Sequence, residues 1–351
     1  MENLVCRAEA ITLRLRTPFR IAHGVSPVRH NVLFHLGEAV GLAALVPYYP
    51  YTQEDVLAYL EGIAPQALLG DDPLALEDAL DRLPPGPPPA CSAVDIACHD
   101  LWGRLMGQPL YRLWGLNPAR APYSSVTIGI PEDENDLRHQ LKEKARYPIL
   151  KLKLGTGDLE RDAAIVRIAS QERKQTSHGD HPGLCVDANS AWSLDEAVEM
   201  IPRLVAYDLL FIEQPIPFSP DDAQDWHRLR RRLPADVPPL IADESLHRPE
   251  DVLALAGAAD GINIKLSKVG GIRPARRIIT LARVLGMQVM LGCMVESAVG
   301  ITAAAHMAPW VDFADLDGNL DVLNDPYVGV QMVDGRLHLP SGAGLGVEPV
   351  G

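Results

Sequence analysis

Five short stretches each carry a charged residue at the end of an apolar run: LKLKLG (150–155), VDAN (186–189), FIEQP (211–215), IADES (241–245) and INIK (262–265). Asp187, Glu213 and Asp243 follow one another at intervals of 26 and 30 residues, each about one strand and one helix long. Because the C-terminal ends of parallel strands meet at the same edge of a sheet, we expect these acids to converge on one site.

Strand and helix patterns alternate from Tyr123 onward, which is typical of a parallel α/β fold. Strand-like runs are expected at 123–130, 149–154, 184–188, 210–213, 240–243, 261–265, 288–292 and 313–315. Helical patterns separate them, for example at 159–174, 194–206 and 272–285. No full helix follows the last strand, so the pattern predicts a (β/α)7β-type TIM barrel at 121–318, with its site at the C-terminal strand ends.

Residues 1–120 have a different, α+β pattern. Strands are expected at 5–15, at 31–36 and near Gly41, and helices at 52–69, 74–83 and 90–106. The run PPGPPP (84–89) is expected to be a loop through Pro89, because proline clashes inside a helix. The tail, 319–351, is expected to return to this part of the chain, so that the two segments form a capping domain.

The composition indicates a globular protein with no polyanionic partner. The 351 residues are 47% hydrophobic and carry a net charge of −14, which argues against binding to nucleic acid or an anionic membrane. No apolar run reaches the roughly 18 residues of a membrane helix, and the N-terminus lacks the apolar block of a secretion signal. The five cysteines are scattered without a C-x-x-C pair, so we expect free thiols in the cytoplasm. A homo-oligomer is possible.

The three acids predict a magnesium site. Asp187, Glu213 and Asp243 would offer hard oxygen ligands from consecutive strands and leave open positions, which suits Mg²⁺. A single aspartate at a strand end is more often a helix cap, but three in phase favour a metal.

The lysines predict proton transfer. Side chains alternate along a strand, so Lys151 and Lys153 point the same way. Two ammonium groups this close are expected to lower one pKa, which would make that lysine a general base. Lys265 is expected across the cavity from Lys153. The alternative is a set of solvated lysines at strand ends, and for Lys268 a loop or helix-start charge is the expectation.

The K-x-K, D-x-N, E-Q-P, D-E-S and I-K motifs, in this order and spacing, resemble the enolase superfamily, and more closely its muconate-lactonizing-enzyme subgroup. The resemblance covers nearly the whole chain and includes GCMVESAVGITAAAHMA (292–308). It implies Mg²⁺ held by the three acids, with Lys153 and Lys265 as the acid/base pair on opposite faces of the substrate and Lys151 tuning them. It places Glu244 and Glu296 at strand ends, either supporting the site or binding substrate.

Asp315 and Asp317 restrict the class of substrate that the site is expected to bind. They share a face at the end of the eighth strand, and this D-x-D resembles that of the dipeptide epimerases, where it receives the α-ammonium group of the substrate. A substrate without a cation would leave two desolvated acids unpaired. The alternative is that Asp317 simply begins a turn.

The first cap loop, TPFRIAHGVSP (17–27), departs from the Ala-Glu epimerases, which usually offer an arginine here to the glutamate side chain. Gly24 aligns with that arginine, and neither Arg20 nor Arg29 matches it cleanly. The resemblance therefore implies a second residue other than glutamate.

The second cap loop is VPYYPYT (46–52), which offers Tyr48, Tyr49 and Tyr51. The three are expected to form an apolar or cation-binding wall, in which Tyr48 and Tyr51 bind substrate, with packing between domains as the alternative. With Asp321 nearby, this wall favours an apolar or cationic second residue.

These features predict an isomerase that epimerizes a dipeptide at the α-carbon next to its C-terminal carboxylate, by 1,1-proton transfer through an enediolate. The alternatives on the same scaffold are an N-acylamino acid racemase, an o-succinylbenzoate synthase or a muconate cycloisomerase-type reaction. A Schiff-base aldolase and a non-catalytic binding protein are alternatives from other classes.

Overall fold

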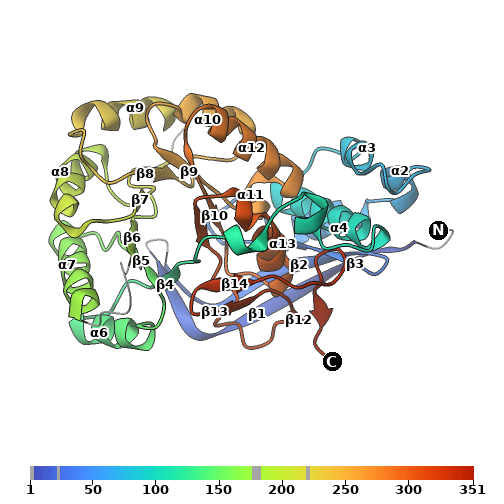
Figure 1. The fold of residues 1–351 in the computed structure, drawn as a ribbon, viewed down its shortest axis with the longest axis horizontal. Helices are drawn as coiled ribbons and strands as arrows, with labels where there is room; N and C mark the ends of the chain where they lie inside the picture. Colours follow the sequence, from blue (N-terminus) through green and yellow to red (C-terminus); the bar gives the residue numbers. More distant parts are fainter. Residues whose placement is uncertain (1–3, 22–23, 176–182, 219–221) are drawn as a thin grey trace.

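A closed parallel sheet forms the larger part of the molecule. The structure, a computed structural model, describes residues 4–21, 24–175, 183–218 and 222–351. Eight strands run in the order β11-β10-β9-β8-β7-β6-β5-β4 (Figure 1). A bridge between Ser124 and Ala314 and a hydrogen bond from Ser125 N to Ala314 O join the two ends. The predicted (β/α)7β barrel is confirmed.

The barrel strands are short and almost wholly buried, as expected for strands covered on both faces. They are β4 (Val126–Ile128), β5 (Ile149–Lys153), β6 (Gly183–Asp187), β7 (Ile212–Glu213), β8 (Leu240–Ala242), β9 (Gly261–Ile264), β10 (Gln288–Gly292) and β11 (Phe313–Asp315). Each overlaps a predicted run.

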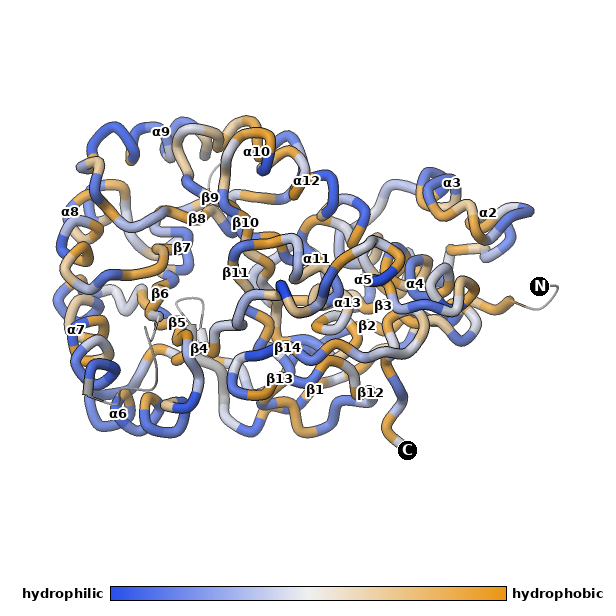
Figure 2. The backbone as a smooth tube through the Cα atoms, viewed as in Figure 1, coloured by the Kyte–Doolittle hydropathy of each residue, from blue (hydrophilic) through white to orange (hydrophobic). Residues whose placement is uncertain are grey.

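The barrel helices surround the sheet, and α9 is largely hydrophilic, whereas α13 is buried along its whole length (Figure 2). They are α6 (Glu134–Glu143), α7 (Leu159–Gln175), α8 (Leu194–Leu204), α9 (Asp222–Arg232), α10 (Pro249–Leu255), α11 (Leu266–Val269), α12 (Ile272–Val284) and α13 (Ala298–Met307), with 3₁₀ turns η2 (Val205–Tyr207) and η3 (Ala308–Trp310). Residues at the helix N-termini explain where the helices begin. At α8, for example, Ser193 and Glu196 form a capping box. No described helix is long and apolar enough to cross a membrane.

The N-terminal part, which we call the cap, is a three-stranded antiparallel sheet covered by helices. Its elements are β1 (Cys6–Ile21), β2 (Gly24–Leu36), β3 (Ala39–Ala43), α1 (Gln53–Glu61), α2 (Pro65–Leu69), α3 (Leu76–Asp81) and α4 (Pro88–Leu105), followed by α5 (Leu110–Leu113) and η1 (Pro118–Arg120). Strand β3 lies so close to α4 that a Cβ on Gly41 would meet Ala93 O at 1.8 Å. Only glycine allows this approach.

Two cap predictions were wrong in detail. The helix expected at 52–69 is two helices, because Gly62 ends α1 and Pro65 begins α2. Helix α4 begins at Pro88, inside the proline run expected to be a loop. Proline is tolerated in the first turn of a helix because the N–H groups there have no partner within the helix.

The C-terminal tail runs back along the cap hairpin. Leu323 N donates to Arg14 O at 2.9 Å, and Arg16 N donates to Asp321 O at 2.8 Å. The tail also forms two small ladders, β12 (Tyr327–Val328) with β15 (Glu348–Pro349), and β13 (Gln331–Val333) with β14 (Arg336–His338). These contacts support our proposal that the capping domain comprises 1–120 and 319–351.

Two buried hydrogen-bonded contacts, which we call joints, attach the cap to the barrel. Asp95 of α4 accepts from Ile272 N at 2.6 Å, at the start of α12, and Ala44 N donates to Ser267 Oγ at 2.9 Å. A carboxylate at a helix N-terminus is favoured both by the free N–H groups and by the helix dipole. The joints hold the loop after β3 beside the C-terminal ends of β8 and β9.

Candidate functional site

The strand ends bring the predicted acids and lysines together. In the sheet register, Asp187 lies between Lys153 on one side and Glu213 on the other. Asp243 follows β8, and Lys265 follows β9. All five side chains are buried.

Lys151 is the centre of the cluster. Its side chain is 1% exposed, and its Nζ lies 2.7 Å from Asp315 Oδ2, 2.7 Å from Glu213 Oε2 and 3.2 Å from Asp187 Oδ2. Burial alone would lower the pKa of Lys151, but the three carboxylates raise it well above its ordinary value. The expectation that crowding lowers the pKa of one lysine in the K-x-K pair is therefore wrong for Lys151, because carboxylates surround its ammonium group.

Lys153 and Lys265 face different acids. Lys153 Nζ donates to Asp187 Oδ2 at 2.6 Å, and Lys265 Nζ donates to Asp243 Oδ2 at 2.6 Å. Burial opposes the charge of Lys265, but Asp243, Tyr48 and nearby glutamates raise its pKa well above the ordinary value. Both lysines stand at the strand ends, each bound to a different acid.

Lys268 occupies a helix start, one of the two positions expected for it, but its side chain is buried. It lies in α11, it is 3% exposed, and its Nζ donates to Asp243 Oδ1 at 2.5 Å and to the Asp243 carbonyl. Burial, with help from the neighbouring Lys265, lowers the pKa of Lys268, while Asp243 raises it. The chain turns directly after β9, and this turn brings Lys268 back onto Asp243.

The three predicted metal ligands differ in charge state. Burial disfavours the charge of Asp187, but Lys153 and Lys151 hold its pKa at about 2. Lys265 and Lys268 hold the pKa of Asp243 well below its ordinary value in the same way. Burial and the adjacent Asp187 raise the pKa of Glu213 to about 8. Of the three carboxylates, Glu213 is thus the one whose negative charge is least compensated by its surroundings.

The three predicted ligands carry oxygen donors of the type that binds a divalent cation. Among the described residues, no three acidic, histidine or cysteine side chains already surround one point as a bound metal requires. Instead, lysine ammonium groups contact the carboxylates, and Asp187 and Glu213 both face the ammonium of Lys151. Oxygen atoms that gather around one cationic group are the ligand type that Mg²⁺ prefers. Asp243 lies on Lys265 and Lys268 instead, so a metal held by Asp187, Glu213 and Asp243 together stays a prediction.

Two amides that the sequence did not single out position these acids. Gln214 Oε1 accepts from Asp243 N at 2.9 Å and from Ser245 N at 3.2 Å. Asn263 Nδ2 donates to Glu213 Oε1 at 2.8 Å. Gln214 directly follows β7 as part of the E-Q-P motif, and Asn263 lies on β9 two residues before Lys265, so these positions were the available signal.

Asp315 and Asp317 are placed differently from one another. Asp315 belongs to the buried cluster. Its carboxylate accepts hydrogen bonds from Lys151 Nζ at 2.7 Å and from Ser125 Oγ at 2.5 Å. Asp317 is half-buried, and Thr127 N donates to its Oδ2 at 2.7 Å. Burial and Asp315 raise the pKa of Asp317 to about 6. Asp317 is the more accessible carboxylate of the pair.

Two further carboxylates are buried beside the cluster. Burial and Asp243 raise the pKa of Glu244 to about 7, and its Oε2 has no hydrogen-bond partner in the described part of the chain. Glu296 accepts from Met294 N at 3.1 Å, and burial raises its pKa to about 8. Asp321, also predicted to bind substrate, lies half-buried in the tail where it contacts β1.

The tyrosines of the second cap loop separate into two groups. Tyr48 and Tyr49 touch edge-to-face at 5.1 Å, and burial raises the pKa of Tyr48 to about 12. The charges of Lys265, Glu244 and Asp243 also act on the pKa of Tyr48, so this ring lies beside the cluster. Tyr51 packs against the core of the cap, and its role in binding substrate stays a prediction.

Tyr49 continues into an aromatic group that the sequence did not predict. Its ring lies 6.1 Å from that of His247, and the His247 ring lies 5.1 Å from Phe218. Phe218 follows β7, His247 follows β8, and Phe218 is 53% exposed. We call Tyr48, Tyr49, Phe218 and His247 the aromatic wall.

Gly24, in the first cap loop, begins β2 with φ +124°, and no atom lies within 4 Å of where its Cβ would be. The Arg20 side chain lies outside the described residues. Arg29 is 6% exposed, donates to Val28 O at 3.0 Å, and has no carboxylate partner in the described part of the chain. Burial lowers the pKa of Arg29, and the neighbouring Tyr48 raises it.

Comparisons with known proteins identify the family of the chain. Residues 136–350 match the family model described as Enolase C-terminal domain-like. The chain is 41% identical over 315 residues to an L-Ala-D/L-Glu epimerase of Bacteroides thetaiotaomicron, covering 88% of this chain and 78% of that one. It is 32% identical over 357 residues to a hydrophobic dipeptide epimerase of Enterococcus faecalis, covering 97% of both.

A solved structure shows the same fold over nearly the full length. It is the dipeptide epimerase from Methylococcus capsulatus complexed with Mg and dipeptide L-Arg-D-Lys, and it has a TM-score of 0.85 and 32% identity, covering 98% of each chain. The chain therefore belongs to the enolase superfamily, in the family of enolase C-terminal domain-like proteins.

Proposed function

We propose that the protein is a Mg²⁺-dependent dipeptide epimerase that inverts the α-carbon next to the C-terminal carboxylate. The proposal rests on the buried cluster at the strand ends. In it, Lys153 is paired with Asp187 and Lys265 with Asp243, two acids of one predicted metal site. Two lysines so placed can serve two faces of one carbon. We place the reaction in the cytoplasm, as the sequence predicts.

The lysines divide the proton transfers. One lysine, in its neutral form, takes the α-proton, while the other, as an ammonium group, delivers a proton to the opposite face. Bound Mg²⁺ would offset the negative charge that develops on the substrate carboxylate. The buried surroundings strengthen each of these interactions, because water does not screen them.

The D-x-D pair would hold the amino terminus of the dipeptide. Asp315 is already engaged by Lys151, so Asp317 would supply the main contact to the α-ammonium group, with Asp315 behind it. This geometry favours a free amino terminus over the N-acyl group of an N-acylamino acid racemase substrate. A library of dipeptides incubated in D₂O, analysed by mass spectrometry for α-deuterium, tests the proposal directly.

Metal removal should abolish activity, and added Mg²⁺ should restore it. Asp243→Asn should weaken metal binding by more than the roughly 10- to 100-fold found for residues that only support a ligand. Mn²⁺ binding, followed by electron paramagnetic resonance, checks this without an activity assay. Asp236→Asn, at an exposed acid, is the matched control. Full activity in thoroughly chelated protein would contradict the metal assignment.

Lys153→Ala and Lys265→Ala should each reduce epimerization by about 100- to 10,000-fold, the usual contribution of a positioned acid or base. Each variant should still exchange deuterium into the one stereoisomer that its remaining lysine reaches. Nuclear magnetic resonance of each isomer in D₂O measures this. Loss of exchange from the same isomer in both variants would show that the lysines do not serve opposite faces.

N-acetylation of the substrate should lower kcat/KM by roughly 10- to 150-fold, because a charge-assisted hydrogen bond contributes about 1.5–3 kcal/mol. Asp317→Asn should reproduce part of this loss on free dipeptides and leave Mn²⁺ affinity unchanged. In the Asp317→Asn variant, N-acetylation of the substrate should lower kcat/KM only slightly further. Equal rates on free and acetylated dipeptides would favour the racemase alternative.

The aromatic wall should favour an apolar or cationic second residue over glutamate. Phe218→Ala should lower kcat/KM for an aromatic second residue by about 3- to 10-fold relative to alanine, the effect of one lost ring contact. Tyr123→Ala is the control, since that ring lies against Arg336 instead. A clear preference for L-Ala-L-Glu would contradict this prediction and direct attention to the buried Arg29.

A further inference from the structure

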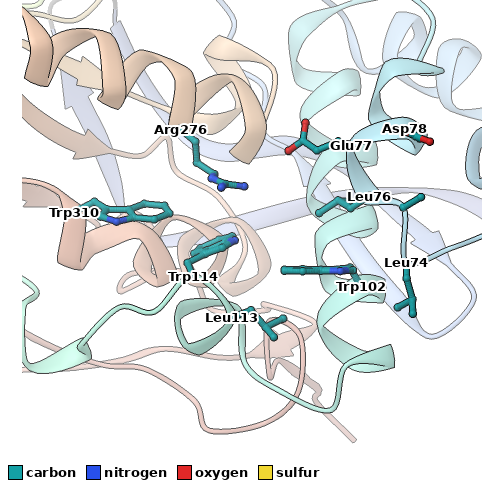
Figure 3. Close-up of a pocket in the computed structure, with 10 residues that line it drawn as sticks. Leu74, Leu76, Glu77, Asp78, Trp102, Leu113, Trp114, Arg276 and Trp310 are labelled. Atoms are coloured by element: carbon teal, nitrogen blue, oxygen red, sulfur yellow. The ribbon is translucent and has the colours of Figure 1, made fainter.

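The cap does not pack on the barrel without a break. Where α3 and α4 face α12, a cleft of about 560 Å³ lies between the two parts, with Trp102 on the cap side and Arg276 on the barrel side (Figure 3). The position of the cap therefore depends on separate contacts, two of which are the joints at Asp95 and Ala44. A third is formed by residues 317–325 of the tail, which follow β11 and which we call the strap.

The strap binds the outer edge of the cap sheet. Asn324 uses both atoms of its side-chain amide: its Oδ1 accepts from Arg14 N at 2.7 Å, and its Nδ2 donates to Thr12 O at 2.8 Å. Beside this contact, Leu15 and Val322 form an antiparallel bridge. Strand β1 is the last strand of the sheet on this side, so the strap adds a short strand to its free edge.

The strap meets β1 at the point where the pairing of β1 with β2 is interrupted. The register is continuous up to the pair Arg14–Val28 and resumes at the pair Phe19–Ser26, so four residues of β1 lie across from one residue of β2. Extra residues of this kind bend a strand and are left without a partner in the ladder. Arg16 N, inside the interruption, donates instead to a carbonyl of the strap at 2.8 Å. The strap therefore takes the place of β2 in holding this part of β1.

The next residue of the strap binds the barrel. Asp325 Oδ1 accepts from Ser297 Oγ at 2.6 Å, and its Oδ2 accepts from Ala298 N at 2.7 Å, at the N-terminus of α13. A carboxylate is favoured at this position by the free N–H groups and by the helix dipole. Two adjacent side chains thus tie the cap to the barrel, Asn324 on β1 and Asp325 on α13.

The cap sheet connects β1 to the second cap loop. Asn31 of β2, which pairs with Ile11 of β1, holds both ends of this loop. Its Oδ1 accepts from Leu45 N at 3.2 Å before the loop, and its backbone carbonyl accepts from Gln53 Nε2 at 2.8 Å after it. Gln53 Nε2 also reaches Ile11 O at 3.4 Å. A hydrogen-bonded series therefore runs from the strap through β1 and β2 to the loop that carries the two tyrosines of the aromatic wall.

We propose that Asn324 and Asp325 are positioning residues that set the aromatic wall over the barrel mouth. The tyrosines of the wall belong to the cap, whereas Phe218 and His247 belong to the barrel, so the spacing of the two sides depends on how the cap is held. The inference rests on the proposed function, in which the wall receives the second residue of the dipeptide. In the described part of the chain, neither Asn324 nor Asp325 contacts the predicted acids and lysines, so loosening the strap should leave these in place.

Asn324→Ala should raise KM for dipeptides with an aromatic second residue by about 3- to 10-fold, the effect of one or two lost hydrogen bonds. The kcat should stay within about twofold, because a contact made equally in the ground state and the transition state changes KM alone. Dipeptides with alanine as the second residue should be unaffected. Asn324→Asp, which keeps the acceptor for Arg14 N and loses the donor to Thr12 O, should restore part of the loss. Gln331→Ala is the control, since it removes an exposed tail amide that donates to Gly329 O.

A double-mutant cycle separates positioning from a general loss of stability. With an aromatic second residue, Phe218→Ala should lower kcat/KM less in the Asn324→Ala background than in the wild type, because the displaced tyrosines no longer hold the substrate ring against Phe218. A protein that is merely less stable would show additive losses. Without any substrate, hydrogen–deuterium exchange of the Arg14 amide should rise at least about tenfold in Asn324→Ala, since its acceptor is gone.

Unchanged exchange at Arg14 would overturn the proposal even in a fully active enzyme. So would a rise in KM that is equal for alanine and aromatic second residues, or additive losses in the cycle with Phe218→Ala. A wild-type protein that epimerizes no dipeptide would instead refute the proposed function, and the specificity role of the strap with it.

Discussion

Carboxylates can be buried side by side only where cations are buried with them, and the strand ends of this barrel are built on that constraint. Lys151 contacts acids from three strands, β6, β7 and β11, and Asp243 lies between two lysines. Removing one partner from such a group leaves a buried charge uncompensated, at a cost of several kcal/mol. The positions of the strands and the positions of the charges therefore depend on one another.

The same constraint explains why the site suits a metal and proton transfer. Glu213 has a pKa raised to about 8 because burial and Asp187 oppose its charge, so the cluster still attracts positive charge. A divalent cation would supply it and would compete with the lysines for the carboxylates. Lys153 and Lys265 would then be free to move protons at a bound substrate.

The cap contributes the remaining part of the site through a few rigid contacts. Asp95 fixes α4 to the start of α12, and Ala44 is hydrogen-bonded to Ser267. These joints place Tyr48 and Tyr49 beside Lys265 and opposite the loops that carry His247 and Phe218. The residues proposed to set specificity thus come from both parts of the chain, whereas the acids and lysines predicted to do the chemistry come from the barrel alone.

The sequence by itself determined the barrel and the set of candidate acids and lysines, because both depend on local pattern. Each strand is a short apolar run, and each functional side chain occupies a fixed position at its end, so spacing alone placed Asp187, Glu213 and Asp243 at one edge. The tertiary structure decided the charge of those groups. Lys151 has a raised pKa because Asp315, 164 residues away, reaches it, and Lys268 is buried because the chain turns back onto Asp243 after β9. Such effects act through space between distant segments, and a pattern read along the chain does not contain them.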